Sequence, residues 1–156
     1  PSTARFRVLE AELHFAEAER LRAAGDEVAA LLEEHASIRG LEVLDALPAL
    51  SSRTRMSVHR LAGWIHTKRR DWPKAEVGFR RAREFDPESP VLAGAHAQAL
   101  VGCAEEERAG VERVRLITEA RALLEELDEV AVPEEMRADL MRRLALVGGA
   151  PEPKSD

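Results

Sequence analysis

The feature that most constrains this chain is a helix bounded by prolines, RRDWPKAEVGFRRAREFDPESP, at residues 69–90. Pro73 suits the first turn of a helix, where a missing N–H costs nothing, and Pro87 suits the position after its end. Between them, one helical face combines small residues with large rings: Ala75, Gly78, Phe79, Ala82 and Phe85. Two helices cross closely only where a small side chain meets a large one. The segment therefore predicts a tightly packed helical hairpin.

The remainder of the 156 residues also favours helix. Ala, Leu, Arg and Glu dominate, and Asn and Tyr are absent, which is typical of helical proteins from GC-rich bacterial genomes. Caps, prolines and glycines divide the chain into about seven helices, at 4–24, 27–47, 55–70, 72–85, 90–108, 111–129 and 133–148. No strand-like alternation is present. We predict an all-α domain at 1–149, followed by a disordered tail at 150–156.

The net charge of −6 conceals a block pattern. Residues 9–34 carry eight acids and two arginines, whereas residues 53–83 carry ten bases and two acids. Residues 105–139 are acidic again, with twelve acids and five arginines. A basic middle segment therefore lies between two acidic segments. This uneven distribution says more about the kind of partner the protein binds than the net charge does.

Residues 56–88 contain a recognisable repeat. Gly63, the run Ala75-x3-Phe79-x2-Ala82 and the closing Asp86-Pro87 resemble the tetratricopeptide repeat (TPR) family, and Asp71-Trp72 resembles the turn between its two helices. The departures are three positions where the family favours Trp, Leu and Tyr: His59, Ala62 and His66. The flanking repeats are irregular; in the first, Glu34 occupies the expected aromatic position. The resemblance implies an α-solenoid of antiparallel helix pairs with a concave side.

The resemblance also implies a binding surface. One face of the predicted helix 55–70, about 120° from its apolar stripe, carries Ser57, Arg60, Trp64 and Lys68. In TPR proteins this face lines the concave groove. Gln98 and Val101 of the next hairpin are expected beside it, and Gly94 and Gly102 would leave room for a bound chain. The alternative is that Trp64 packs inside the molecule while the two cations are solvated.

Three functions are compatible with this pattern. The first is a non-catalytic adaptor, scaffold or chaperone that binds a peptide or helix of an acidic partner protein. The second is an RNA-binding repeat protein that uses the basic block 53–83, with Trp64 and Trp72 as stacking platforms. The acidic flanks oppose the approach of a polyanion, which favours the first. The third is self-association, in which the basic middle meets an acidic flank of another copy.

Catalytic and cofactor motifs are absent from the sequence, so we expect no enzyme activity, no cofactor and no metal. His59 and His66 stand without Cys, Asp or Glu at ligand spacing, and we expect them to be partly buried packing residues. Cys103 is the only cysteine, which excludes an intrachain disulfide. The N-terminal residues lack an apolar signal core, and the run at 91–105, which is uncharged up to Glu105, is too short to span a membrane. A cytoplasmic location is therefore expected.

Overall fold

The computed structural model describes residues 2–107, 110–127 and 132–149, which form seven α-helices and no strand. The prediction of an all-α chain with about seven helices is confirmed within these ranges. The helices are α1 (Ser2–Ala23), α2 (Glu27–Asp45), α3 (Ser52–Lys68), α4 (Trp72–Phe85), α5 (Pro90–Glu106), α6 (Val111–Glu126) and α7 (Glu134–Gly148). The predicted helix ends at 108 and 129 and the tail at 150–156 lie outside the described residues.

Local residue chemistry accounts for most helix boundaries. Gly25, at a φ of +84°, ends the turn after α1 in a conformation that other residues rarely adopt. Asp26, Ser51 and Ser89 cap α2, α3 and α5, each accepting a hydrogen bond from the backbone N–H three residues further on. Asp71 precedes α4 as predicted, but its side chain makes no capping hydrogen bond. Its carboxylate lies 3.0 Å from the ammonium group of Lys74 instead.

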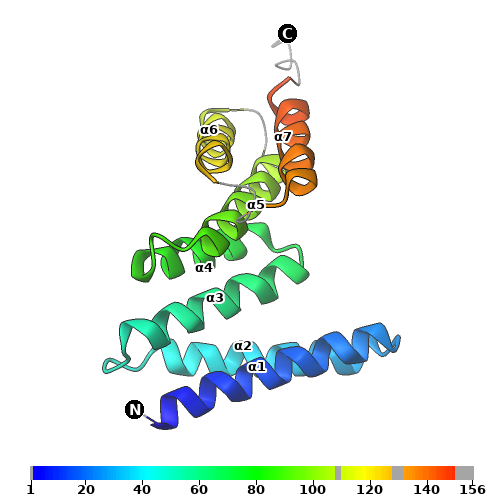
Figure 1. The fold of residues 1–156 in the computed structure, drawn as a ribbon. Helices are drawn as coiled ribbons and strands as arrows, with labels where there is room; N and C mark the ends of the chain where they lie inside the picture. Colours follow the sequence, from blue (N-terminus) through cyan, green and yellow to red (C-terminus); the bar gives the residue numbers. More distant parts are fainter. Residues whose placement is uncertain (1, 108–109, 128–131, 150–156) are drawn as a thin grey trace.

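The helices form two antiparallel hairpins followed by a group of three helices (Figure 1). Helices α1 and α2 form the first hairpin, and α3 and α4 form the second. Helix α5 packs against α4 on one side and against α6 and α7 on the other. Because α6 is seen end-on in Figure 1 while α3 runs across the view, its axis crosses that of α3 steeply. Apolar clusters fill the space between α1, α2 and α3, between α4 and α5, and among α5, α6 and α7.

The crossing of α3 and α4 has the predicted small-to-large packing. Phe79 is fully buried against Gly63, where an added Cβ atom would lie only 2.7 Å from the Cε1 atom of the ring. A Cβ atom on Gly78 would lie 2.8 Å from the backbone nitrogen of Gly63. The two glycines therefore let the helix backbones meet, and the Phe79 ring fills the space beside them.

Two apolar positions differ from expectation. Phe85, the last residue of α4, is exposed at 36%, and its ring stacks on that of His59 on α3 with centroids 6.1 Å apart. On α7, Met136, Leu140 and Leu144 recur every four residues, a spacing that predicts one buried stripe; Leu140 and Leu144 are buried, whereas Met136 is 46% exposed. Residues four apart drift by about 40° per step around a helix, so the stripe turns away from the core before it reaches Met136.

Candidate functional site

Trp64, the predicted apolar anchor, is half-buried at the junction of α3, α4 and α5. Its ring meets the Phe79 ring edge to face, with centroids 5.1 Å apart and planes at 77°. One side of the indole therefore belongs to the core. An aromatic ring held in this way is rigid, and only its outer part is available to a ligand.

The room expected at Gly102 is filled by the chain itself, and Val101 is buried instead of lining a groove beside Trp64. Val101 is fully buried in the cluster among α5, α6 and α7, and Gln98 is half-buried on α5. Gly102 is covered by Trp72, since an added Cβ atom would lie 2.2 Å from the Cδ2 atom of that indole. Gly102 has no side chain, and the Trp72 indole of the same chain occupies the space that a bound peptide was expected to use.

The two predicted cations, Arg60 and Lys68, face carboxylates of α1. The Nη2 atom of Arg60 lies 3.8 Å from Oε1 of Glu12, and the Nζ atom of Lys68 lies 2.8 Å from Oε2 of Glu19. Both pairs are partly exposed, so each contributes at most about 1 kcal/mol to stability. Their main effect is that neither cation is free to attract a partner with its full charge.

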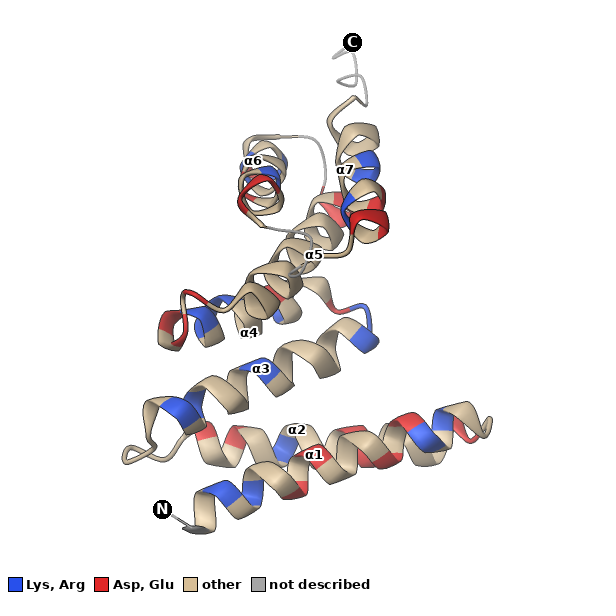
Figure 2. Cartoon of the chain, in the orientation of Figure 1, with Lys and Arg blue, Asp and Glu red and all other residues tan. Residues whose placement is uncertain are grey.

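Most of the basic block is compensated in the same way. Seven of its ten bases lie within 4 Å of a carboxylate oxygen: Arg55, Arg60, Lys68, Arg69, Lys74, Arg80 and Arg81. Several of these carboxylates belong to α1 and α2, so the acidic first hairpin docks on the basic second one (Figure 2). The basic middle and the first acidic block therefore meet within one chain. The block pattern was the signal for this contact, although the third of the candidate functions placed it between two copies of the chain.

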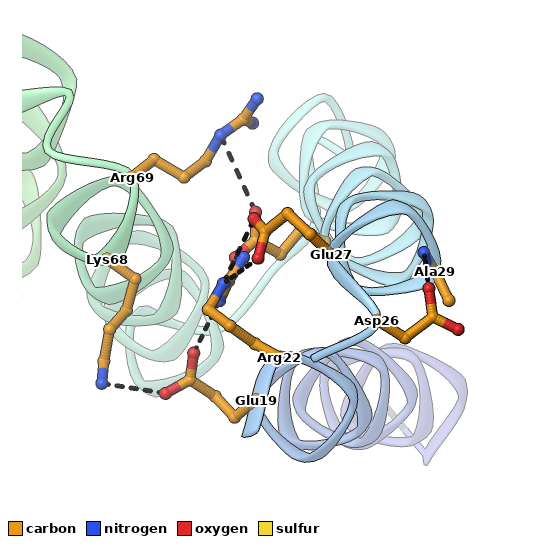
Figure 3. Close-up of polar contacts among 8 residues, drawn as sticks. Glu19, Arg22, Asp26, Glu27, Ala29, Lys68 and Arg69 are labelled. Carbon is orange, nitrogen blue, oxygen red and sulfur yellow. Dashed lines mark hydrogen bonds and ion pairs between the residues drawn. The ribbon is translucent and has the colours of Figure 1, made fainter. Parts of the chain in front are cut away.

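Glu34, where the resemblance to TPR repeats predicts an aromatic residue, is fully buried between the hairpins. Arg22 donates a hydrogen bond of 2.6 Å to its Oε1 atom, and the Nε atom of Arg69 lies 3.8 Å from its Oε2 atom (Figure 3). Among the described residues, that second oxygen accepts no hydrogen bond. The hydrogen bond to Glu34 raises the pKa of Arg22. The buried ion pair therefore stands where the resemblance implies an aromatic contact. It links the end of α1, through Glu34 on α2, to the end of α3.

A groove of about 1450 Å³ wraps the N-terminal half of α1 and the start of α3. Its apolar lining comes from α1, α2 and the loop before α3: Val8, Leu9, Val43, Leu47, Pro48 and Leu50. Arg5, Arg7 and Arg53 add positive charge, and Glu12 is the only carboxylate in the lining. Ser57 is the one predicted site residue that lines this groove. The groove therefore combines an apolar lining with net positive charge.

A second pocket, of about 240 Å³, lies among α2, α3 and α4. His59 and His66 line it, with Nε2 of His59 3.4 Å from Asp45 and Nδ1 of His66 3.7 Å from Asp71. Burial lowers the pKa of both histidines, so they are neutral at pH 7. The expectation of buried packing histidines is confirmed. No cluster of three or more metal-ligating side chains occurs in the part of the chain that the structure describes.

Cys103 is half-buried on α5. Burial raises the pKa of its thiol to about 12. A thiol with such a pKa is protonated at pH 7, and only the thiolate is a good nucleophile. Cys103 is therefore an inert packing residue.

No family model matches this chain, and neither a curated protein nor a solved structure resembles it significantly. Among the described helices, none is both long enough and apolar enough to cross a membrane.

Proposed function

We propose that this protein is a non-catalytic interaction module, a TPR-like α-solenoid that binds a peptide or helix of an acidic partner protein. The groove around α1 carries this proposal. It offers apolar side chains for the buried side of a partner segment and three arginines for carboxylates at its edges. Because Glu12 lies beside Arg60, its charge is partly compensated and opposes an acidic partner little.

The proposal moves the binding surface from the middle of α3 to its N-terminal end. Arg60 and Lys68 are paired with α1, whereas Arg53 makes no ion pair among the described residues. Ser57 lies one turn after Arg53, and its hydroxyl donates to the Arg53 carbonyl at 3.1 Å, so its hydrogen-bond donor is already satisfied within the helix. Trp64 stays a candidate contact at the far margin of the same helix face.

RNA binding is the second candidate, and the structure gives it less support. A stacking platform needs an open ring face, but Trp64 packs on Phe79 and Trp72 packs on Gly102. Most of the basic block is also compensated by carboxylates of the chain itself, which reduces the number of phosphates it can neutralise.

The test is a capture experiment from bacterial lysate with the immobilised protein, with and without nuclease. Arg5 and Arg53 are exposed, so the double variant Arg5→Glu, Arg53→Glu reverses the groove charge without touching the core. A matched control is the double variant Arg121→Glu, Arg142→Glu, which changes two exposed arginines on α6 and α7.

We expect the parent and the control to retain the same acidic proteins after nuclease treatment and the groove variant to lose them. Equal capture by the groove variant would place the binding surface elsewhere. Capture that nuclease removes from all three proteins would favour the RNA-binding alternative.

A further inference from the structure

The first hairpin carries a second apolar stripe on both helices, in addition to the one that packs on α3. On α1 the stripe consists of Phe6, Glu10 and Leu13, and on α2 it consists of Leu32, Ala36, Arg39 and Val43. Its large apolar side chains are well exposed, from 52% for Val43 to 71% for Leu13. Monomeric proteins in water rarely expose a contiguous row of large apolar side chains. A stripe of this kind therefore marks an interface.

The stripe faces away from the second hairpin. On α1, the residues that reach α3 include Glu12 and Val8. Glu10 is two positions from each, about 200° around the helix. On α2, Leu41 packs in the cluster with α3, and the exposed residues Arg39 and Val43 are each two positions from it, about 200° around the helix.

Contacts within the hairpin fix how the two stripes align. The Ser37 hydroxyl donates to the Ala11 carbonyl at 2.7 Å, and His14 Nδ1 lies 2.6 Å from Glu33. Ala11 is therefore level with Ser37. The two helices are antiparallel and rise equally per residue, so each step back from Ala11 on α1 matches one step forward from Ser37 on α2. Phe6 is therefore level with about residue 42, and Glu10 with about residue 38. Each stripe thus has an apolar residue, a charged residue and an apolar residue at matching levels.

The charges at the matching level are opposite, acidic on α1 and basic on α2. Neither Glu10 nor Arg39 forms an ion pair among the described residues, and both are exposed. We infer that this face binds a second copy of the chain, related by a two-fold axis parallel to the helices. Such an axis places α1 of each copy over α2 of the other at the same level. Phe6 then meets Val43, and Glu10 meets Arg39, twice in each dimer.

This arrangement differs from contact between the basic middle and an acidic flank, because both charges belong to the first hairpin. Val43 belongs both to this stripe and to the groove around α1, whereas Arg53 and Ser57 on α3 line the groove alone and carry no part of the dimer contact. Dimer formation and partner binding are therefore separable by mutation.

Sedimentation equilibrium of the full chain over a range of concentrations tests the inference. We expect a dimer whose dissociation constant rises at least about tenfold in Glu10→Arg and in Arg39→Glu, because like charges then face each other. The double variant Glu10→Arg, Arg39→Glu should return to within about threefold of the parent. Glu125→Arg, an exposed change on α6, is the matched control and should leave the dissociation constant unchanged.

A parent protein that is monomeric at every concentration would overturn the inference. A dimer in which the double variant is as weak as the single variants would overturn it too, because Glu10 and Arg39 would then not face each other. Circular dichroism shows whether each variant keeps its helices, which is expected because every changed residue is exposed.

Discussion

The packing of Phe79 on Gly63 predicts that two damaging substitutions will partly cancel. Phe79→Ala removes a fully buried ring, and such changes cost about 3–5 kcal/mol. We expect about 4–5 kcal/mol here, because the facing residue is a glycine and has no side chain to occupy the cavity. Gly63→Ala places a methyl group 2.7–3.0 Å from three ring atoms. Overpacking costs about 1–3 kcal/mol, offset by about 1 kcal/mol of helix propensity.

In the double variant Gly63→Ala, Phe79→Ala, the methyl group enters space that the ring has left. The overpacking cost then disappears and the gain in helix propensity remains. Gly63→Ala should therefore stabilise the Phe79→Ala protein by about 1 kcal/mol, although it destabilises the parent. The difference between the two backgrounds equals the overpacking cost, a coupling of about 1–3 kcal/mol between the two sites.

Urea unfolding followed by circular dichroism at 222 nm measures all four proteins. Gly40→Ala is the matched control, because a Cβ atom there would make an ordinary contact of 3.9 Å with Ala11. It should be neutral or slightly stabilising. If Gly63→Ala changed stability equally in both backgrounds, the size complementarity between α3 and α4 would be refuted.

Three further predictions concern other parts of the core. Leu140→Asp should cost about 4 kcal/mol, because it buries a carboxylate without a partner among α5, α6 and α7; an unchanged melting temperature would contradict the docking of α7. Arg22→Met should cost about 3 kcal/mol or more, since Glu34 then stays buried with only Arg69 nearby, whereas Glu34→Met should be nearly neutral; equal costs in urea unfolding would refute this asymmetry. The pKa values of His59 and His66 are lower in the folded protein than the unfolded value of about 6.5, so the unfolded chain binds more protons. The urea midpoint should therefore fall as the pH drops below 6.5. The double variant His59→Phe, His66→Phe should show a smaller fall, and an equal fall would exclude these histidines as its cause.

The helices and the α3–α4 crossing could be predicted because their signals are local. Caps such as Ser51 and Ser89 act on the backbone three residues away, so the sequence alone reveals them. The crossing could be identified from two glycines, Gly63 and Gly78, and the large ring of Phe79. Small residues facing a large one require only the two adjacent helices that carry them. These features depend little on the rest of the molecule.

The binding surface was harder to predict because it depends on how the hairpins dock. Charge blocks show that opposite charges exist, but the angle between hairpins decides that Arg60 meets Glu12 and Lys68 meets Glu19. Gly102 looked like open space, and only the three-dimensional structure shows Trp72 over it. The groove around α1 likewise combines segments that are distant in sequence. Its one sequence signal was the presence of apolar residues on two faces of the first helix.

The most direct test of the proposed binding groove is site-specific photo-crosslinking in bacterial cells that produce the protein. A photoreactive p-benzoylphenylalanine replaces Ser57 in the groove or, as a control, exposed Arg121 on α6. We predict light-dependent adducts with one or a few acidic proteins from position 57 only, resistant to nuclease and lost when Arg5→Glu and Arg53→Glu are added. The absence of adducts at position 57, or the same adducts from position 121, would contradict the proposal that this groove binds an acidic protein partner.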